Sequence, residues 1–181
     1  MKTYARPVKA MHWIVALVVG ATLLGGLTLG LLGFEGVTDA FGAAGRDAIY
    51  EYHKTGGLII FALMLLRIFF RRRHGKPAYD PPIADWERRL SGWVQYALYA
   101  ALVAMPVIGW AATDALDYPV EFFSWDLPQA IPKSESAGNL LYEVHETLGW
   151  AIVGLLGLHI GGALRHLILK RDQVFRRMWP I

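Results

Sequence analysis

Residues 142–169 read YEVHETLGWAIVGLLGLHIGGALRHLIL, an apolar stretch interrupted by two histidines, His145 and His159. Fourteen helical positions at about 100° each return to within about 40° of the starting direction, so both imidazoles share one helix face. Their separation along the axis is about 21 Å at 1.5 Å per residue. One imidazole therefore lies near each edge of a hydrocarbon slab about 30 Å thick. Because ionisable side chains in a membrane helix mark an ion path, a proton relay or a cofactor, the stretch predicts two stacked metal sites.

Composition restricts the class of protein. Of the 181 residues, 55% are hydrophobic and only 18% are charged, which is typical of a membrane protein and not of a soluble domain. The absence of cysteine excludes disulfides, iron–sulfur clusters, zinc–thiolate sites and covalent attachment of haem. The charges form short runs beside apolar segments, a pattern that indicates membrane topology and contact with lipid, with no nucleic-acid partner.

Four apolar segments are long enough to span a membrane, at about residues 8–32, 49–70, 90–112 and 140–169. They predict one all-α domain over residues 1–181, an integral membrane four-helix bundle of antiparallel up-down order. The expected connections are a glycine-rich loop (33–45), a loop with prolines including Pro81 (71–89) and a longer loop (113–138).

The distribution of lysine and arginine predicts the orientation. With both termini cytoplasmic, the inner side collects fifteen cations: Lys2, Arg6, Lys9, Arg67, Arg71, Arg72, Arg73, Lys76, Arg88, Arg89, Arg165, Lys170, Arg171, Arg176 and Arg177. The outer side keeps only Arg46, Lys54 and Lys133, together with eleven of the 15 acidic residues. The positive-inside rule therefore predicts a multi-pass membrane protein, N-in and C-in.

The first apolar segment has a second interpretation. A basic start followed by an apolar run also fits a cleaved signal peptide. The run over residues 8–32 is longer than a signal core, and the small-residue site after it is poorly formed. We therefore expect it to remain as a membrane span.

Four histidines fall at two depths. His12 lies near the inner start of the first span and His53 near the outer start of the second, whereas the fourth span carries His145 outside and His159 inside. Depth therefore pairs His12 with His159 and His53 with His145. Each pair offers one iron two trans imidazoles from facing helices, an arrangement that favours electron transfer over oxygen binding. The two irons would lie about 20 Å apart along the bundle.

Other readings of these residues stay open. A lone membrane histidine is often an interhelical hydrogen-bond partner, and a proton relay would need a carboxylate at mid-membrane depth, which the spans lack. Lys54 and Arg46 near the outer pair, and Arg67 near the inner pair, are candidates for contacts with haem propionates. Arg67 also fits an interface anchor. We expect His74 to be solvated, and His166 to have either no role or one in proton or quinone chemistry.

Small and aromatic residues give weaker signals. Several glycines make room either for a flat macrocycle or for ordinary helix contacts: Gly56, Gly57, Gly149, Gly157, Gly161 and Gly162. Six tryptophans near the expected interfaces fit an aromatic belt: Trp13, Trp86, Trp93, Trp110, Trp150 and Trp179. The sequence identifies no catalytic residue.

Five motifs and the tail carry a resemblance to a known family. They are His12-Trp13, His53-Lys54-Thr55-Gly56 with Met64-Leu65-Leu66-Arg67, Met105-Pro106-Val107-Ile108-Gly109-Trp110, His145-Glu146-Thr147-Leu148, Gly157-Leu158-His159, and Arg176-Arg177-Met178-Trp179-Pro180. Over essentially its whole length the chain resembles the bacterial di-haem cytochrome b561 family. The resemblance implies two non-covalent b haems with His12, His53, His145 and His159 as ligands. It also implies a location in the bacterial inner (plasma) membrane and exchange of electrons with the quinone pool.

These residues and the resemblance leave three candidate functions. The resemblance implies an oxidoreductase that oxidises superoxide and reduces ubiquinone, for which Arg46, Lys54 and Lys133 are the cations available to attract the anion. The alternative is a cytochrome b membrane anchor that relays electrons between a periplasmic redox partner and the quinone pool, with residues 113–138 docking the partner or covering the haem. The third is a haem-free structural or transport protein whose histidines only pack.

Overall fold

The computed structural model describes residues 3–79, 82–123 and 125–179, so Lys2, Pro81 and Pro180 lie outside the described residues. Its elements in chain order are helix α1 (Arg6–His74), helix α2 (Asp85–Ala115), strands β1 (Glu121–Phe122) and β2 (Trp125–Asp126), helix α3 (Glu135–Leu164) and a π-helical turn η1 (Arg165–Lys170). The prediction of a mostly helical chain is confirmed. Within these ranges three helical stretches are long and apolar enough to cross a membrane: Arg6–His74, Asp85–Ala115 and Glu135–Lys170.

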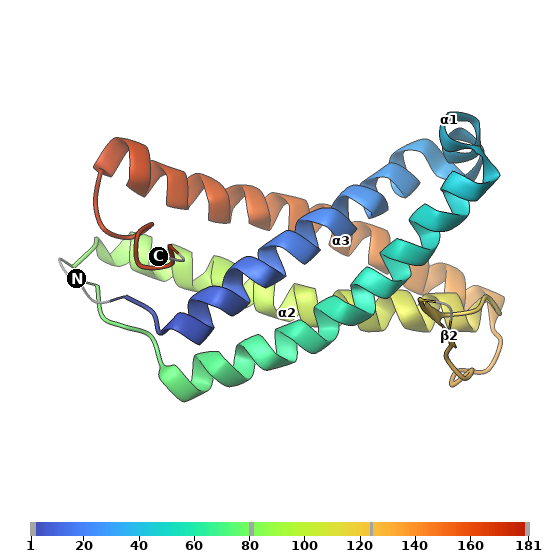
Figure 1. The fold of residues 1–181 in the computed structure, drawn as a ribbon, viewed down its shortest axis with the longest axis horizontal. Helices are drawn as coiled ribbons and strands as arrows, with labels where there is room; N and C mark the ends of the chain where they lie inside the picture. The colour runs from blue at the N-terminus through green and yellow to red at the C-terminus, as the bar shows by residue number, and fades with distance from the viewer. Residues whose placement is uncertain (1–2, 80–81, 124, 180–181) are drawn as a thin grey trace.

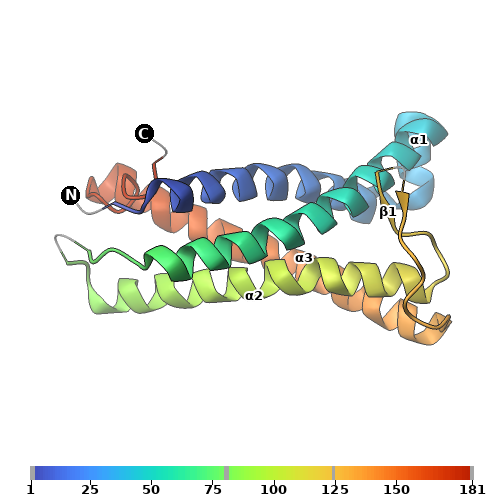
Figure 2. The same cartoon turned by 60° about the horizontal axis from the view of Figure 1, so that its bottom comes forward.

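Helix α1 turns back on itself (Figures 1 and 2). Its 69 residues would extend about 100 Å if straight, more than three times the thickness of a hydrocarbon core. The reversal lies between Gly33 (φ 66°, ψ 179°) and Gly42 (φ 71°, ψ 170°). Residues with side chains rarely adopt such angles, so glycine at both positions permits the turn. An outgoing limb (residues 6–32) and a returning limb (residues 43–74) result.

The prediction of four separate helices therefore needs correction. The first two expected spans, 8–32 and 49–70, both belong to α1, and the expected loop 33–45 is helical between its two glycine kinks. The sequence pattern located the glycines but gave no sign that helical hydrogen bonding resumes between them.

The connection between α2 and α3 is shorter than expected and contains a two-stranded antiparallel sheet, in which Glu121 faces Asp126 and Phe122 faces Trp125. Helix α3 begins at Glu135, where the side chain of Ser134 accepts a hydrogen bond from the backbone N–H of Ala137. At its other end, the expected α-helix to residue 169 is wrong beyond Leu164, because η1 is π-helical. Single π-helical turns occur often at functional positions.

The apolar core lies at the middle of the bundle. Its buried members are Val15 and Val19 from the outgoing limb of α1 and Ile60 and Met64 from the returning limb, packed against Leu156 of α3 and residues of α2. The two described ends of the chain lie together at one end of the bundle, and the reversal of α1 and the β-strands lie at the other (Figures 1 and 2). Most other helical surface is exposed and apolar, as a lipid environment requires.

Candidate functional site

The structure brings the four histidines together in two pairs. His12 of the outgoing limb faces His159 of α3, with ring centroids 6.1 Å apart and planes at 80°. His53 of the returning limb faces His145 of α3, with centroids also 6.1 Å apart and planes at 85°. The core residues Val15, Val19, Ile60 and Met64 occupy helix positions between the two pairs.

The spacing within each pair suits a single metal ion held from both sides. A metal–imidazole bond of about 2 Å on each side of one ion places the two ring centroids about 6 Å apart. Among residues 3–79, 82–123 and 125–179, no three histidine, cysteine or carboxylate side chains lie close enough together to hold a metal ion. Two imidazoles leave a metal under-coordinated unless a planar macrocycle supplies the other ligands, as haem does.

His53 is oriented by the backbone. Its Nδ1 lies 3.0 Å from the carbonyl oxygen of Thr22, which can accept a hydrogen bond when that nitrogen carries the proton. Such a bond to the carbonyl fixes the tautomer and leaves Nε2 free to bind a metal.

A cavity surrounds the His53–His145 pair. Its volume is about 660 Å³ and its walls include Gly26, Gly109 and Trp110, a size within the range of small-molecule and cofactor sites. The backbone approaches closely on both sides of the pair. A Cβ atom added to Gly26 would lie 2.7 Å from Cε1 of His53, and one added to Gly109 would lie 2.7 Å from Cε1 of His145.

Two buried nitrogens in the cavity wall have no hydrogen-bond partner among the described residues, Nδ1 of His145 and the indole Nε1 of Trp110, and the indole nitrogen is always a donor. Buried donors are almost always paired, so an unpaired one points to a missing acceptor. A carboxylate on a bound macrocycle would be such an acceptor. The donor set, the spacing, the cavity and this free N–H all fit a haem.

The three cations expected beside the histidines occupy different places. Arg67 donates from Nη1 to Nδ1 of His12 at 2.8 Å and from Nε to the hydroxyl oxygen of Tyr99 at 2.9 Å, so it belongs to the site of the His12–His159 pair. Lys54 lines the outer cavity. Arg46 instead lies at the start of the returning limb of α1, with its guanidinium carbon 4.2 Å from the ring centroid of Phe34.

Each of the outer cations is paired with a carboxylate. Lys54 donates to the Glu121 carboxylate and to the carbonyl of Pro119 at 3.0 Å, Arg46 pairs with Asp47 at 2.8 Å, and Lys133 pairs with Asp117 at 2.8 Å. Hydrogen bonding and the charge of Lys133 hold the pKa of Asp117 below its usual range, so that pair stays ionised at neutral pH. The local charge of the outer lysines and arginine is therefore largely neutralised.

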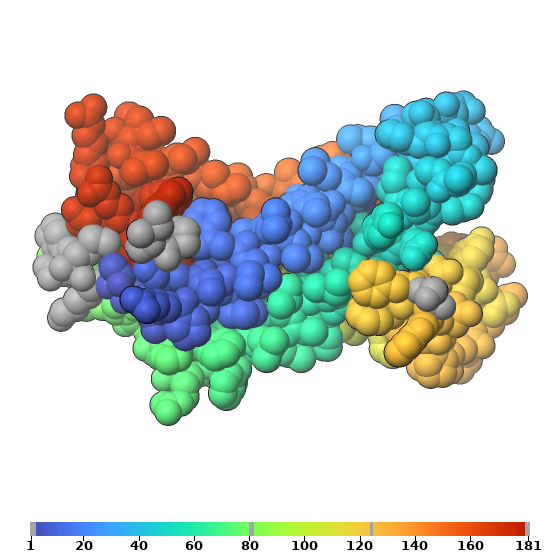
Figure 3. Space-filling model, in the orientation of Figure 1, coloured from blue at the N-terminus to red at the C-terminus, as the bar shows by residue number. Residues whose placement is uncertain are grey.

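The hairpin covers the outer cavity. The Lys54–Glu121 pair links β1 to the returning limb of α1 directly after His53, and the backbone N–H of Phe123 donates to the hydroxyl of Thr55 at 3.0 Å. Figure 3 shows this connecting segment against the returning limb. Residues 118–121 all line the cavity, so the first half of the connection between α2 and α3 forms its outer wall.

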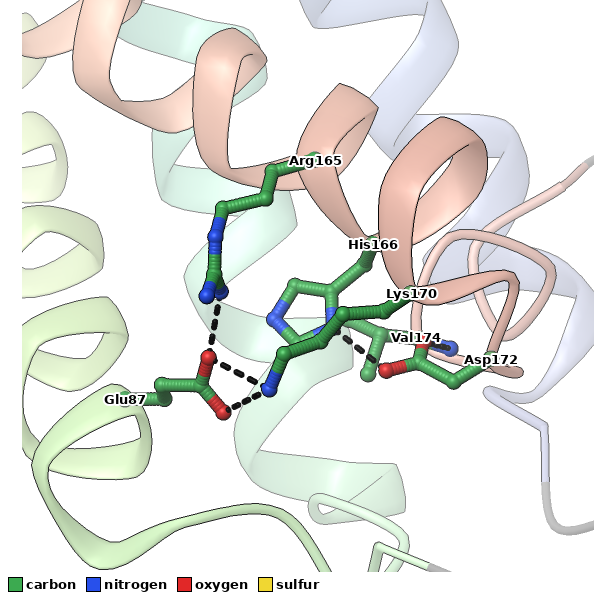
Figure 4. A network of polar contacts seen from close by, with 6 residues as sticks. All are labelled: Glu87, Arg165, His166, Lys170, Asp172 and Val174. Atoms are coloured by element: carbon green, nitrogen blue, oxygen red, sulfur yellow. Dashed lines mark hydrogen bonds and ion pairs between the residues drawn. The ribbon is translucent and has the colours of Figure 1, made fainter.

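The remaining two histidines stand apart from these pairs. His74 is exposed at the end of α1 and stacks on Phe70, as expected for a solvated side chain. His166 is buried on η1, with its Nδ1 2.6 Å from the carboxylate of Asp172. Figure 4 shows this pair beside a second cluster, in which the buried Glu87 carboxylate binds Arg165 and Lys170.

The sequence analysis did not identify Gly26 and Gly109 as site residues. A signal for Gly26 was present, because it follows His12 by fourteen residues, the same spacing that separates His145 from His159. Arg67 follows His53 by fourteen residues as well. Of the glycines that were considered, Gly56 fits a helix contact, since its Cβ would collide with the side chain of Thr22.

Comparison with known proteins agrees with this geometry. The family model described as prokaryotic cytochrome b561 matches residues 3–180. Cytochrome b561 homolog 2 of Escherichia coli (strain K12) is 25% identical over 170 residues, which cover 93% of this chain and 87% of that protein. The probable superoxide oxidase CybB of Yersinia pestis is 25% identical over 173 residues, 94% of this chain and 92% of that protein. The chain belongs to the prokaryotic cytochrome b561 family, and membership implies a membrane protein that transfers electrons and binds b-type haem.

Proposed function

We propose that the chain holds two non-covalent b haems, one between His12 and His159 and one between His53 and His145, and carries electrons across the membrane between them. The observation that supports this proposal is the equal spacing of the two pairs, each with centroids 6.1 Å apart, on opposite sides of an apolar core. With both termini on the inner side, as the cation distribution favours, His53 and His145 form the outer centre.

Residues of the chain determine which ligands could reach the two haems and how dry the space between them is. Each bound haem supplies a one-electron carrier. In each pair the two imidazoles would hold the haem iron from both sides, which would exclude oxygen and other small ligands from it. The buried side chains of Val15, Val19, Ile60 and Met64 exclude water between the centres, and low polarity there reduces the solvent rearrangement that accompanies electron transfer.

The first candidate for the electron donor is superoxide, and the first candidate for the acceptor is ubiquinone. The Yersinia pestis relative is named a probable superoxide oxidase. In this assignment, two superoxide ions lose one electron each and become oxygen, and these two electrons with two protons reduce one ubiquinone to ubiquinol. His53 and His145 would hold the haem on the donor side. No residue of this chain is assigned a catalytic role in the oxidation.

Haem content and a coupled assay test this function. A pyridine haemochrome measurement on detergent-purified protein should give about two b haems per chain. Addition of superoxide should then reduce ubiquinone at a rate that scales with protein concentration, with oxygen as the other product. Protein that is folded and supplied with haem but binds none would overturn the proposal. Two haems without superoxide-dependent quinone reduction would overturn only the choice of donor.

A second candidate donor is a periplasmic redox protein, with the chain as its membrane anchor. The specific observation in its favour is that Arg46, Lys54 and Lys133 are each paired with a carboxylate. Cations neutralised in this way attract a small anion weakly, because each positive charge has a negative charge within 3 Å. The hairpin also covers the cavity, which favours electron entry from a docked surface.

Substitution of Glu121 by Gln tests the electrostatic argument behind this choice, namely that Glu121 neutralises Lys54 at the outer cavity. The variant frees the charge of Lys54 beside the outer cavity. Reduction of the outer haem by dithionite, an anionic reductant, should accelerate about threefold at low ionic strength, and reduction by reduced hexaammineruthenium, a cation, should slow by a similar factor. Stopped-flow absorbance at the haem band measures both rates.

Asp117→Asn is the matched control for that experiment. It also removes one carboxylate and frees one lysine at the outer end, but Asp117 and Lys133 do not belong to the described lining of the cavity. Its effect on both reductants should be clearly smaller. Equal effects of the two variants would indicate a general surface potential instead of local control by Lys54 and Glu121.

A further inference from the structure

The C-terminal tail, residues 172–179, folds back over the inner end of the bundle. Its backbone meets the start of the chain, where the N–H of Tyr4 donates to the carbonyl oxygen of Arg177 at 3.2 Å. In Figures 1 and 2 the chain beyond α3 returns toward the first turns of the outgoing limb. The tail thus lies beside the helix end that carries His12.

Arg177 fixes the tail in place. It is 4% exposed, and its guanidinium donates to the carbonyl oxygens of Pro77 and Ala78 in the loop between α1 and α2. The same group lies 4.1 Å above the ring of Tyr79 and 5.5 Å above that of Tyr4. One buried side chain therefore joins the tail, the loop and the N-terminal segment, and stacking on aromatic rings adds to its hydrogen bonds.

Asp172, the first residue of the tail, is also held in place by side-chain contacts. The carboxylate of Asp172 contacts Nδ1 of His166 at 2.6 Å through one oxygen and accepts the N–H of Val174 at 2.9 Å through the other (Figure 4). This contact gives the buried His166 a structural role at the point where η1 ends. With Arg177, it holds the tail at both of its ends.

Trp13 connects the tail to the inner histidine pair. Its indole Nε1 donates to the carbonyl oxygen of Met178 at 2.8 Å, and its ring packs edge-on against Trp179 with centroids 5.8 Å apart. On its other side the same ring contacts the imidazole of His12, at 5.2 Å between centroids. The position of the Trp13 ring, and through it that of the His12 ring, depends on the tail.

We propose that the C-terminal tail is part of the inner haem site, and that Trp13, held by Met178 and Trp179, is a positioning residue for His12. The inference rests on the proposed function, because it takes His12 as an iron ligand. The orientation of an axial imidazole about its iron bond influences the electronic state of the iron, and hydrogen bonds outside the ligands tune metal sites. Loosening Trp13 should therefore affect the inner haem alone.

Trp13→Phe tests this proposal, because it keeps an aromatic ring beside His12 but removes the N–H that binds Met178 and reduces the ring surface that packs on Trp179. Transfer of the inner haem to an excess of apomyoglobin should become about threefold to tenfold faster, the factor expected for one lost hydrogen bond. The low-spin EPR signal of the inner haem should shift or broaden while the outer signal stays unchanged. The protein with His145→Ala, which keeps the inner haem, assigns the two signals.

Trp93→Phe is the matched control, since Trp93 is a helical tryptophan of α2 that is 75% exposed. It should leave both EPR signals and both transfer rates unchanged. Unchanged inner-haem properties in Trp13→Phe would overturn the proposal for the tail while leaving the two-haem function intact. A parent protein with no inner haem would overturn the proposed function itself.

A second pair of variants tests the effect of the tail on the inner haem by a change that does not contact His12. Arg177→Gln should release the tail and reproduce the inner-haem changes, whereas Arg176→Gln, at an exposed neighbour, should not. If Arg177→Gln yields unfolded protein, Trp13→Phe still decides the result. A folded Arg177→Gln protein with both haems unaltered would contradict the proposal.

Discussion

Substitution of His145 by Ala is expected to lower the haem content of the purified protein from about two to about one per chain. His145 offers one of the two imidazoles of the outer pair, and no other described histidine is paired with His53 at that depth. A single remaining imidazole holds haem weakly and leaves one axial position open. A pyridine haemochrome assay gives the content, and reduced-minus-oxidised spectra show which haem band is lost.

The other histidines supply the comparisons for this result. His53→Ala should remove the same haem as His145→Ala, and His12→Ala and His159→Ala should each remove the other one. His74→Ala, at an exposed position, should retain both haems. Loss of the same haem in His53→Ala and His159→Ala would show that the pairs are assigned wrongly.

Replacement of Gly109 by Ala is expected to have the next largest effect, loss of most of the outer haem without loss of the fold. The new Cβ would lie 2.7 Å from Cε1 and 2.9 Å from Nδ1 of His145. The imidazole would have to move, which changes the position of its Nε2 relative to a bound iron. Alanine itself favours a helix over glycine by about 1 kcal/mol, so the variant should remain helical by circular dichroism. Haem content and the EPR signal of the outer haem measure the effect.

Gly154→Ala is the control for this steric argument. It lies in α3 between His145 and His159, and a Cβ there meets no described atom within 4 Å. Both haems should be retained. Gly26→Ala should behave like Gly109→Ala, because its Cβ would lie 2.7 Å from Cε1 of His53. Full haem content in both Gly26→Ala and Gly109→Ala would show that close backbone approach is not needed at the outer centre.

Periodicity along the helices explains why so much of the site follows from one sequence. A spacing of fourteen residues returns a helix to nearly the same face about 21 Å further on. The chain uses this spacing three times, from His12 to Gly26, from His53 to Arg67 and from His145 to His159. Each limb of α1 and helix α3 therefore presents one residue to each centre.

The sequence by itself determined the apolar segments, the class of protein and which histidines lie at the same level of the bundle, because hydrophobicity and helical rise are local properties. The continuation of helix between Gly33 and Gly42, the Lys54–Glu121 pair over the cavity and the placement of the tail against Trp13 were decided only by the tertiary structure. The Lys54–Glu121 pair joins residues 67 positions apart in the chain, and the Trp13–Met178 contact joins residues 165 positions apart. A local sequence pattern predicts neither contact, and it does not decide whether the segment between the two glycines is helix or loop.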